Sequence, residues 1–253
     1  MRCVRFEEQG RARIGFIDGD VIRAVYGSID TYWRMTDEVF PLAGAKLLAP
    51  CVPKQIICVG FNYRDHAREF HVDVPKEPAL FTKAAHTVIG NDGKIIYPRQ
   101  SHEVVYEAEL GVVIKKRMKD VAPEDVPDYI LGYTCANDVT ARDLQLSDVQ
   151  WLRSKPFDTF CPLGPWLETD LDPTDLSIKL YLNGQLKQNG RTSDMVYNPY
   201  EILSYISQSM TLDAGDLILT GTPMGCGPML PGDEVVVEIE GIGKLRNEVV
   251  KGY

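Results

Sequence analysis

The sequence predicts an α+β protein dominated by strands. Short apolar runs rich in β-branched residues recur along the chain and alternate with turns rich in glycine, proline and aspartate, as expected for strands. Long helical patterns are few, and only one segment carries a full set of helix signals. At 253 residues the chain can bury a full core, as one large domain or as a large domain with a small one attached.

The first fifty residues form the smaller unit. Two apolar runs, 14–17 and 21–22, flank Asp18-Gly19-Asp20, which is a strong hairpin signal. The segment 41–53 resembles a linker, because it begins and ends with proline and contains few periodic residues. We therefore expect a small β-rich domain over residues 1–50 and a larger domain over residues 51–253.

The larger domain begins with a short strand and ends with a hairpin. Residues 56–59 predict a buried strand that stops at Gly60, and the polar stretch 62–70 has helical character. Another apolar run at 217–219 predicts a strand after a turn, and residues 234–250 predict the final hairpin.

The clearest helix follows Asn198. This residue is a good N-cap, Pro199 occupies the first helical position, and Glu201 completes a capping box. Four apolar residues then recur on one face of the predicted helix: Ile202, Leu203, Ile206 and Met210.

Composition excludes several classes of function. The net charge of −9 and the lack of a Lys/Arg-rich run argue against a nucleic-acid partner. No apolar stretch reaches membrane-spanning length, and the N-terminus lacks the apolar core of a signal peptide. The six cysteines are scattered without a Cys-x-x-Cys pair, as expected for reduced thiols. We therefore expect a cytoplasmic enzyme that acts on a small molecule.

Two glutamates at the start of an apolar strand are the first chemical signal. Residues 110–114 predict a buried strand. Glu107 and Glu109 lie at its start, two positions apart. Side chains two apart on a strand point to the same side, so the two carboxylates repel unless a cation lies between them. The alternative is an edge strand with a solvated acidic face. A second acidic segment, 137–143, follows the apolar run 129–135, and together the two signals favour a divalent-metal site.

A histidine and a glutamate in the predicted helix are the second signal. His66 and Glu69 are three residues apart, which places them on one helix face within hydrogen-bonding reach. A carboxylate beside an imidazole orients it and raises its basicity, which suits general-base activation of water. The alternative is a surface histidine in an ion pair. Gly60 before this segment and the loop 74–78 after it would let it move as a lid.

Two further segments are weaker signals by themselves. Lys155 is flanked by Pro156 and apolar residues, so it is either a partly buried ammonium or an ordinary loop lysine. The glycine-rich segment 220–228 follows a buried strand but lacks the spacing of phosphate-binding and dinucleotide-binding loops. It is either a backbone held open for a small oxyanion or a plain tight turn.

Five motifs in this order resemble the fumarylacetoacetate hydrolase superfamily, from about residue 55 to the C-terminus. They are Gly60-Phe-Asn-Tyr-Arg-Asp-His66 with Glu69; Tyr106-Glu-Ala-Glu-Leu110; Asn137-Asp-Val-Thr-Ala-Arg-Asp143; Lys155 with Phe157-Asp-Thr-Phe160; and Thr220-Gly-Thr-Pro-Met-Gly225. Two positions depart from the pattern, since many relatives carry Asp where Val105 stands and Gly where Lys115 stands. These departures weaken an assignment to one subfamily, such as acylpyruvate hydrolases, oxaloacetate decarboxylases or 2-hydroxyhepta-2,4-diene-1,7-dioate isomerases.

The resemblance implies a mixed β-sandwich roll, a small N-terminal domain and a homodimer. It also implies a divalent metal held by Glu107, Glu109 and Asp138. His66 and Glu69 would form a water-activating dyad on a mobile lid. By the same likeness, four residues would contact the substrate: Arg142, Gln145, Lys155 and Thr222.

Such a metal site would suit the chemistry of 2-oxo acids. Three carboxylates without sulfur or imidazole favour Mg²⁺ or Mn²⁺ and would leave about three octahedral positions open. A 2-oxo acid can fill two of them through its carboxylate and its 2-oxo oxygen. Three carboxylates and the metal sum to one negative charge, so a nearby Lys155 would balance the site and stabilise a developing enolate.

Three hypotheses for the function remain at this point. The first is hydrolysis of the C–C bond of a 2,4-dioxo acid (an acylpyruvate) through a metal-bound enolate, with water activated by the dyad. The second uses the same enolate for decarboxylation of an oxaloacetate-like acid or for isomerisation of a dienedioate. The dyad favours water chemistry. The third is a catalytically silent homologue that acts as a binding or assembly module; the intact set of ligands speaks against it, and metal-dependent turnover would exclude it.

Overall fold

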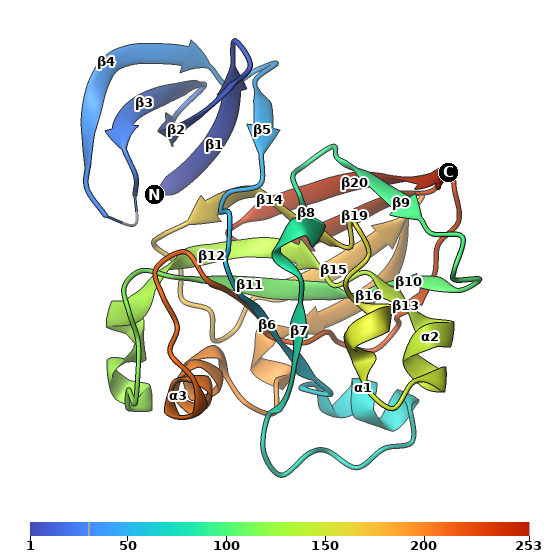
Figure 1. Ribbon diagram of the computed structural model, residues 1–253. Helices are drawn as coiled ribbons and strands as arrows, with labels where there is room; N and C mark the ends of the chain where they lie inside the picture. Colours follow the sequence, from blue (N-terminus) through green and yellow to red (C-terminus); the bar gives the residue numbers. More distant parts are fainter. Residues whose placement is uncertain (30, 253) are drawn as a thin grey trace.

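The protein contains three β-sheets in this computed structural model, which describes residues 1–29 and 31–252 (Figure 1). Tyr253, the last residue of the predicted larger domain, lies outside the described residues. The largest sheet has twelve strands. Its path runs through β4 (Trp33–Pro41), β3 (Val21–Gly27), β2 (Arg11–Asp18), β1 (Arg2–Glu8), β14 (Cys161–Glu168), β12 (Ile130–Asn137), β11 (Ala108–Ile114), β17 (Leu217–Leu219), β6 (Ile56–Gly60) and β7 (Ala79–Lys83), with β5 (Lys46–Leu48) paired to β1 and β8 (Val88–Ile89) paired to β14.

Two smaller sheets and a few short helices complete the fold. The five-stranded sheet contains β16 (Gln185–Arg191), β15 (Ser177–Leu182), β19 (Glu234–Ile239), β20 (Gly243–Lys251) and β9 (Lys94–Tyr97). The three-stranded sheet contains β13 (Thr140–Ala141), β10 (Val104–Tyr106) and β18 (Gly227–Pro228). The helices are α1 (Arg64–Glu69), α2 (Arg142–Ser147), α3 (Pro199–Ser209) and the 3₁₀ turns η1 (Ala85–Thr87), η2 (Pro123–Tyr129), η3 (Trp151–Ser154) and η4 (Thr192–Asp194). The predicted strand-rich α+β class is confirmed.

The main core lies between the largest sheet and the five-stranded sheet. Leu110 and Val112 of β11 pack in one buried cluster with Ile178 of β15 and Val237 of β19. Side chains alternate along a strand, so Val113 belongs to a second cluster on the opposite face of β11. Both faces of β11 are thus packed in core, and Glu109 at the start of the strand lies on the same face as Val113.

The N-terminal strands extend the largest sheet, because β1 pairs with β14. Figure 1 shows these strands curled at the upper left, beside the rest of the molecule. The predicted hairpin is confirmed, since β2 and β3 pair on either side of Gly19. The prediction that 41–53 is only a linker is wrong, because Lys46–Leu48 forms β5 and pairs with β1. The domain boundary at residue 50 stays a prediction.

The helix signals locate α3 correctly. The Asn198 side chain accepts hydrogen bonds from the backbone N–H groups of Tyr200 and Glu201, and Glu201 accepts one from the N–H of Asn198. This capping box was predicted. Met210, which was predicted on the same helix face, follows the last helical residue and has an extended backbone.

Residues 1–29 and 31–252 contain neither a membrane-spanning helix nor a disulfide bond. No helix there is long and apolar enough to cross a membrane. The six cysteines are free thiols, and five of them are buried.

Candidate metal centre and active site

The ends of neighbouring strands bring the acidic residues together. Strands β11 and β12 are antiparallel, with Ala108 opposite Asn137. Glu107 lies in the one-residue break between β10 and β11, and Asp138 directly follows β12. The N–H of Asp138 donates a hydrogen bond to the carbonyl of Glu107 at 2.9 Å. Residues 31 positions apart in the sequence are therefore held side by side by sheet pairing.

Glu107, Glu109 and Asp138 form a compact group of buried carboxylates. One oxygen from each lies within 4.8 Å of the others, and all three residues are at most 5% exposed. This burial excludes the alternative of a solvated acidic face. Buried like charges at such distances repel strongly, so oxygen ligands arranged in this way suit a hard divalent cation. The donor set fits a metal, and it contains neither sulfur nor imidazole.

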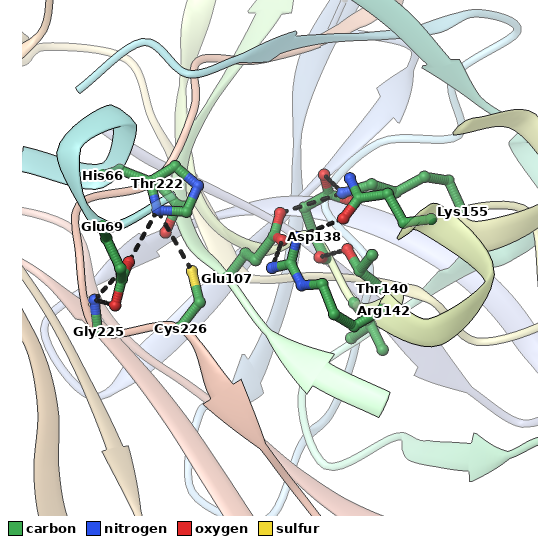
Figure 2. A network of polar contacts seen from close by, with 12 residues as sticks. His66, Glu69, Glu107, Asp138, Thr140, Arg142, Lys155, Thr222, Gly225 and Cys226 are labelled. Atoms are coloured by element: carbon green, nitrogen blue, oxygen red, sulfur yellow. Dashed lines mark hydrogen bonds and ion pairs between the residues drawn. The ribbon is translucent and has the colours of Figure 1, made fainter. Parts of the chain in front are cut away.

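Three cationic side chains contact the same carboxylates, and Figure 2 shows two of them, Arg142 and Lys155. The ammonium of Lys155 lies 3.0 Å from Glu107 Oε2 and 2.5 Å from Asp138 Oδ2. Arg142 donates to Glu107 Oε1 at 2.7 Å. Lys83 donates to Asp138 Oδ1 at 2.6 Å and to the carbonyl of Val139 at 3.0 Å. The alternative that Lys155 is an ordinary loop lysine is excluded, since it is 1% exposed.

Lys83 is a member of this cluster that the sequence analysis missed. It lies at the end of β7 and is buried, and it reaches Asp138 from a strand 55 residues away in the sequence. A lysine at the end of an apolar strand carries no local signal that separates it from a solvated edge lysine. Only the pairing of β7 with β6, and of β6 with β17, brings it to the site.

The environment shifts the pKa values of the two glutamates in opposite directions. Burial alone would raise the pKa of Glu107, but Lys155 and Arg142 outweigh it and lower the pKa to about 2. Burial raises the pKa of Glu109 well above its ordinary value, and repulsion from Asp138 and Glu107 adds to the effect. Burial opposes the charge of Lys155, yet Asp138 and Glu107 outweigh it and raise its pKa. Glu109 is thus the carboxylate that lacks a cationic partner among the described residues.

His66 and Glu69 come from α1 and form the predicted pair. Nδ1 of His66 lies 3.1 Å from Glu69 Oε2, and His66 is only 5% exposed, which excludes a surface histidine. The imidazole lies near the aromatic rings of Phe61 and Phe70, with centroids 5.8 and 4.9 Å away. Because an ionised Glu69 accepts the hydrogen of Nδ1, Nε2 is left free to exchange a proton. Whether α1 moves as a lid stays a prediction.

The glycine-rich segment binds side chains of the site itself. The N–H of Gly221 donates to Glu109 Oε2 at 2.7 Å, and the N–H of Gly225 donates to Glu69 Oε1 at 3.1 Å. Gly221 has φ +95°, and a Cβ there would lie 2.8 Å from Cβ of Asn62, so the turn requires glycine. These two N–H groups thus hold carboxylates of the protein, and a role of the segment in holding a small oxyanion stays a prediction.

Gln188 and Cys226 are further neighbours that sequence reasoning missed. The amide of Gln188, from β16, accepts from the N–H of Ala108 at 2.9 Å and donates to Thr222 Oγ1 at 2.8 Å. It therefore ties the start of β11 to the glycine-rich segment. Sγ of Cys226 lies 4.0 Å from Nδ1 of His66, and burial raises the pKa of this thiol well above its ordinary value, which keeps it neutral.

One small cavity collects seven of the nine predicted site residues. Its polar wall consists of His66, Glu107, Glu109, Arg142, Gln145, Lys155 and Thr222. Its apolar wall consists of Val59, Gly60, Phe61, Phe81 and Trp151. Asp138 and Glu69 do not line the cavity. They contact two residues that do, because Asp138 binds Lys155 and Glu69 binds His66. A ligand in this cavity would meet an ionic cluster and an imidazole at the same time.

Comparison with known proteins identifies the family. The model described as fumarylacetoacetate (FAA) hydrolase C-terminal matches residues 55–250, and the model described as Rv2993c-like, N-terminal matches residues 1–50. This chain belongs to the fumarylacetoacetate hydrolase family. A mitochondrial oxaloacetate tautomerase, FAHD2B of Bos taurus, is 42% identical over 260 residues, which cover 98% of this chain and 79% of the relative.

Solved structures with related sequences share the whole fold. The 2-hydroxyhepta-2,4-diene-1,7-dioate isomerase of Mycobacterium marinum is 41% identical with a TM-score of 0.92, and covers 99% of this chain and 98% of its own. Maleylpyruvate hydrolase of Sphingobium sp. SYK-6, solved with manganese(II) and pyruvate, is 30% identical with a TM-score of 0.82 and full coverage of both chains. Enzymes of this family therefore include a tautomerase, an isomerase and a hydrolase.

Proposed function

We propose that this protein catalyses proton transfer on a 2-oxo dicarboxylate, as a keto–enol tautomerase or a double-bond isomerase. One observation carries the proposal. His66, oriented by Glu69, faces the same small cavity as the cluster of carboxylates and cations. A proton acceptor opposite a site that stabilises negative charge is the arrangement that enolisation needs.

Each step of this reaction can be assigned to a side chain of the site. Nε2 of His66 takes a proton from C3, the carbon next to the 2-oxo group. As the C3–H electron pair moves into the C2–C3 bond, negative charge develops on the 2-oxo oxygen, and the ammonium of Lys155 stabilises it. His66 then returns its proton to that oxygen, so the keto acid becomes the enol without net change in atoms. Mg²⁺ or Mn²⁺ held by Glu107, Glu109 and Asp138 would supply Lewis-acid stabilisation of the same charge, worth several kcal/mol.

The charges of the cluster favour a dianionic substrate. Its three carboxylates are matched by three cations, since Lys83 and Arg142 join Lys155. A divalent metal ion would then leave an excess of two positive charges in a buried site. A 2-oxo dicarboxylate carries two negative charges and restores neutrality, whereas an acylpyruvate carries one. Arg142 and Gln145, which line the cavity, are the proposed contacts for a substrate carboxylate.

The relatives support the same choice. Two named relatives that are 41–42% identical are a tautomerase of oxaloacetate and an isomerase of a dienedioate. Both names describe a shift of protons within a 2-oxo or 2-hydroxy dicarboxylate. The maleylpyruvate hydrolase is less similar, at 30% identity.

Hydrolysis of an acylpyruvate-type C–C bond is the second candidate. The His66–Glu69 pair favours it, because an imidazole held by a carboxylate can equally deprotonate water. Both candidates share the enolate and differ in whether His66 acts on carbon or on water.

Proton exchange at C3 tests the proposal directly. The protein loaded with Mg²⁺ or Mn²⁺ is incubated in D₂O with oxaloacetate, a 2-hydroxy-dienedioate or an acylpyruvate, and NMR follows deuterium entry at C3 and product formation. We expect exchange and tautomerisation of the dicarboxylates well above a control with the same metal in buffer. Hydrolysis of an acylpyruvate faster than exchange would favour the second candidate. No exchange and no turnover with any of these compounds would refute both.

A further inference from the structure

A second, larger cavity lies directly behind the apolar wall of the site. It has a volume of about 530 Å³ and is formed by β7 and the segment 149–152. Phe81 and Trp151 line both cavities, so they are the partition between them. The outer cavity has no charged side chain among its lining residues; Thr82 and Gln150 are its polar members.

Trp151 is fixed in this partition by aromatic contacts and by a glycine. Its ring meets Phe81 edge-on at 5.3 Å between centroids and Phe61 edge-on at 5.8 Å. A Cβ on Gly60 would lie 2.7 Å from Cζ3 of Trp151, closer than real Cβ contacts. The absence of a side chain at Gly60 therefore gives the indole the room to lie against the end of β6.

We propose that Trp151 is a specificity-determining residue that limits the length of the substrate by closing the inner cavity against the outer one. The proposal rests on the proposed function, because it assumes that a 2-oxo acid binds at the carboxylate cluster. The inner cavity has a volume of only about 20 Å³, so a 2-oxo acid bound at the cluster must be compact as long as the indole stays in place. A 2-oxo acid with a bulky uncharged substituent needs the space that the indole fills, and the uncharged outer cavity would receive that substituent once Trp151 is removed.

Two ligands of different length distinguish binding in the inner cavity alone from binding that also extends into the outer cavity. Oxalate is a compact dianion with the two-oxygen end of a 2-oxo acid, and N-benzyloxamate has the same end followed by an uncharged aromatic group. Binding of each to the Mn²⁺-loaded protein is measured by isothermal titration calorimetry, which needs no turnover. The wild type is expected to bind oxalate at least about tenfold more tightly than N-benzyloxamate, a difference that a closed apolar wall readily gives.

Three variants then test the partition. Trp151→Ala is expected to bind N-benzyloxamate at least about tenfold more tightly than the wild type, while its affinity for oxalate changes less than about threefold. Gly60→Ala should shift the same ratio in the same direction, but less, because it displaces the indole without removing it. Leu152→Ala is the matched control, since Leu152 lines the outer cavity only, and it should leave both affinities unchanged.

The outcomes distinguish this inference from the proposed function. Failure of the wild type to bind oxalate would overturn the proposed function and this inference together. Oxalate binding by both wild type and Trp151→Ala, with N-benzyloxamate excluded from both, would overturn the inference alone. Equal binding of the two ligands by the wild type would also overturn it, because the wall would then not limit length. Retained oxalate binding shows that a variant is folded.

Discussion

The ionic cluster and the His66–Glu69 pair belong to one site but are held in different ways. The carboxylates of the cluster lie at the neighbouring ends of β11 and β12 inside the largest sheet, and the side chains of Lys83, Asp138 and Lys155 are at most 1% exposed. The pair lies on a helix of six residues, and the Glu69 side chain is 28% exposed. Changes in the cluster should therefore alter metal binding, stability or both, whereas changes in the pair should alter rate alone.

Removing the charge of Glu109 should have the largest effect on function. Glu109→Gln keeps an oxygen for the N–H of Gly221 but deletes one of three anionic ligands. We expect Mn²⁺ affinity to fall by more than the roughly 10–100-fold that loss of an outer-shell partner costs. Titration of Mn²⁺ by electron paramagnetic resonance measures this. Chelator should silence the wild type, and Mg²⁺ or Mn²⁺ should restore it.

Stability provides the control for that variant. The raised pKa of Glu109 means that its ionised form is disfavoured in the folded protein, so Glu109→Gln should not lower the melting temperature in chelator. Full activity of chelator-treated wild type would remove the metal from the mechanism, and unchanged Mn²⁺ binding by Glu109→Gln would remove Glu109 from its ligands.

Glu107→Gln should behave in the opposite way and destabilise the fold. It leaves the buried Arg142 without a carboxylate partner among the described residues and leaves Lys155 with Asp138 alone, and breaking a buried pair costs roughly 3–5 kcal/mol. The folded-state pKa of Glu107, about 2, lies below its ordinary value of 4.5. Its stabilisation is therefore present above pH 4.5 and lost as pH falls toward 2. Melting temperatures across this range, in chelator, should fall more for the wild type than for Glu107→Gln, and parallel curves would contradict the assignment.

Removing the imidazole should reduce rate and leave stability and metal binding nearly unchanged. His66→Ala is expected to lose roughly 10²–10⁴-fold in C3 proton exchange, the usual contribution of a general base. Decarboxylation of oxaloacetate needs no such base and should fall much less. His102→Ala, whose side chain is 88% exposed, is the matched control. Equal losses in exchange and decarboxylation would mean that His66 shapes the closed site without transferring protons.

Lys83 should act on the metal through Asp138. Its ammonium does not line the cavity and donates a hydrogen bond to Oδ1 of Asp138. We expect this bond to fix the orientation of the carboxylate. Lys83→Met is expected to weaken Mn²⁺ binding roughly 10–100-fold, as for other outer-shell partners of a ligand. Lys83→Arg, which keeps an N–H donor at this position, should recover part of that affinity if the hydrogen bond to Asp138 is what matters. An unchanged Mn²⁺ affinity in Lys83→Met would leave Lys83 with a purely structural role.

Sequence alone predicts those parts of the site that are local in the chain. Glu107 with Glu109, and His66 with Glu69, are two and three residues apart, so the periodicity of a strand or helix places them together. The capping box of α3 and the β2–β3 hairpin are equally local and equally well predicted.

The rest of the site depends on pairings that no local pattern encodes. Gln188 contacts Ala108 across 80 positions, and Trp151 reaches the site only because β6 ends at Gly60 beside it. Strand order in a sheet decides such contacts, and a single sequence does not reveal that order. The same reason explains why β5 was mistaken for part of a linker, since it is a strand only through its pairing with β1. The homodimer stays a prediction.

Glu69 should have the smallest effect and the most informative one. Its carboxylate orients His66 through Nδ1 and is itself held by the N–H of Gly225, so it acts on the substrate only through the imidazole. Glu69→Gln should reduce C3 exchange about 10-fold, because an amide can bond either tautomer of the imidazole and no longer selects one. In a His66→Ala background the same change should cost nothing further, since residues that act as one unit are not additive. Exchange rates of the two single variants and the double variant measure this coupling. A second full loss in the double variant would instead mean that Glu69 anchors α1 to the glycine-rich segment independently of His66.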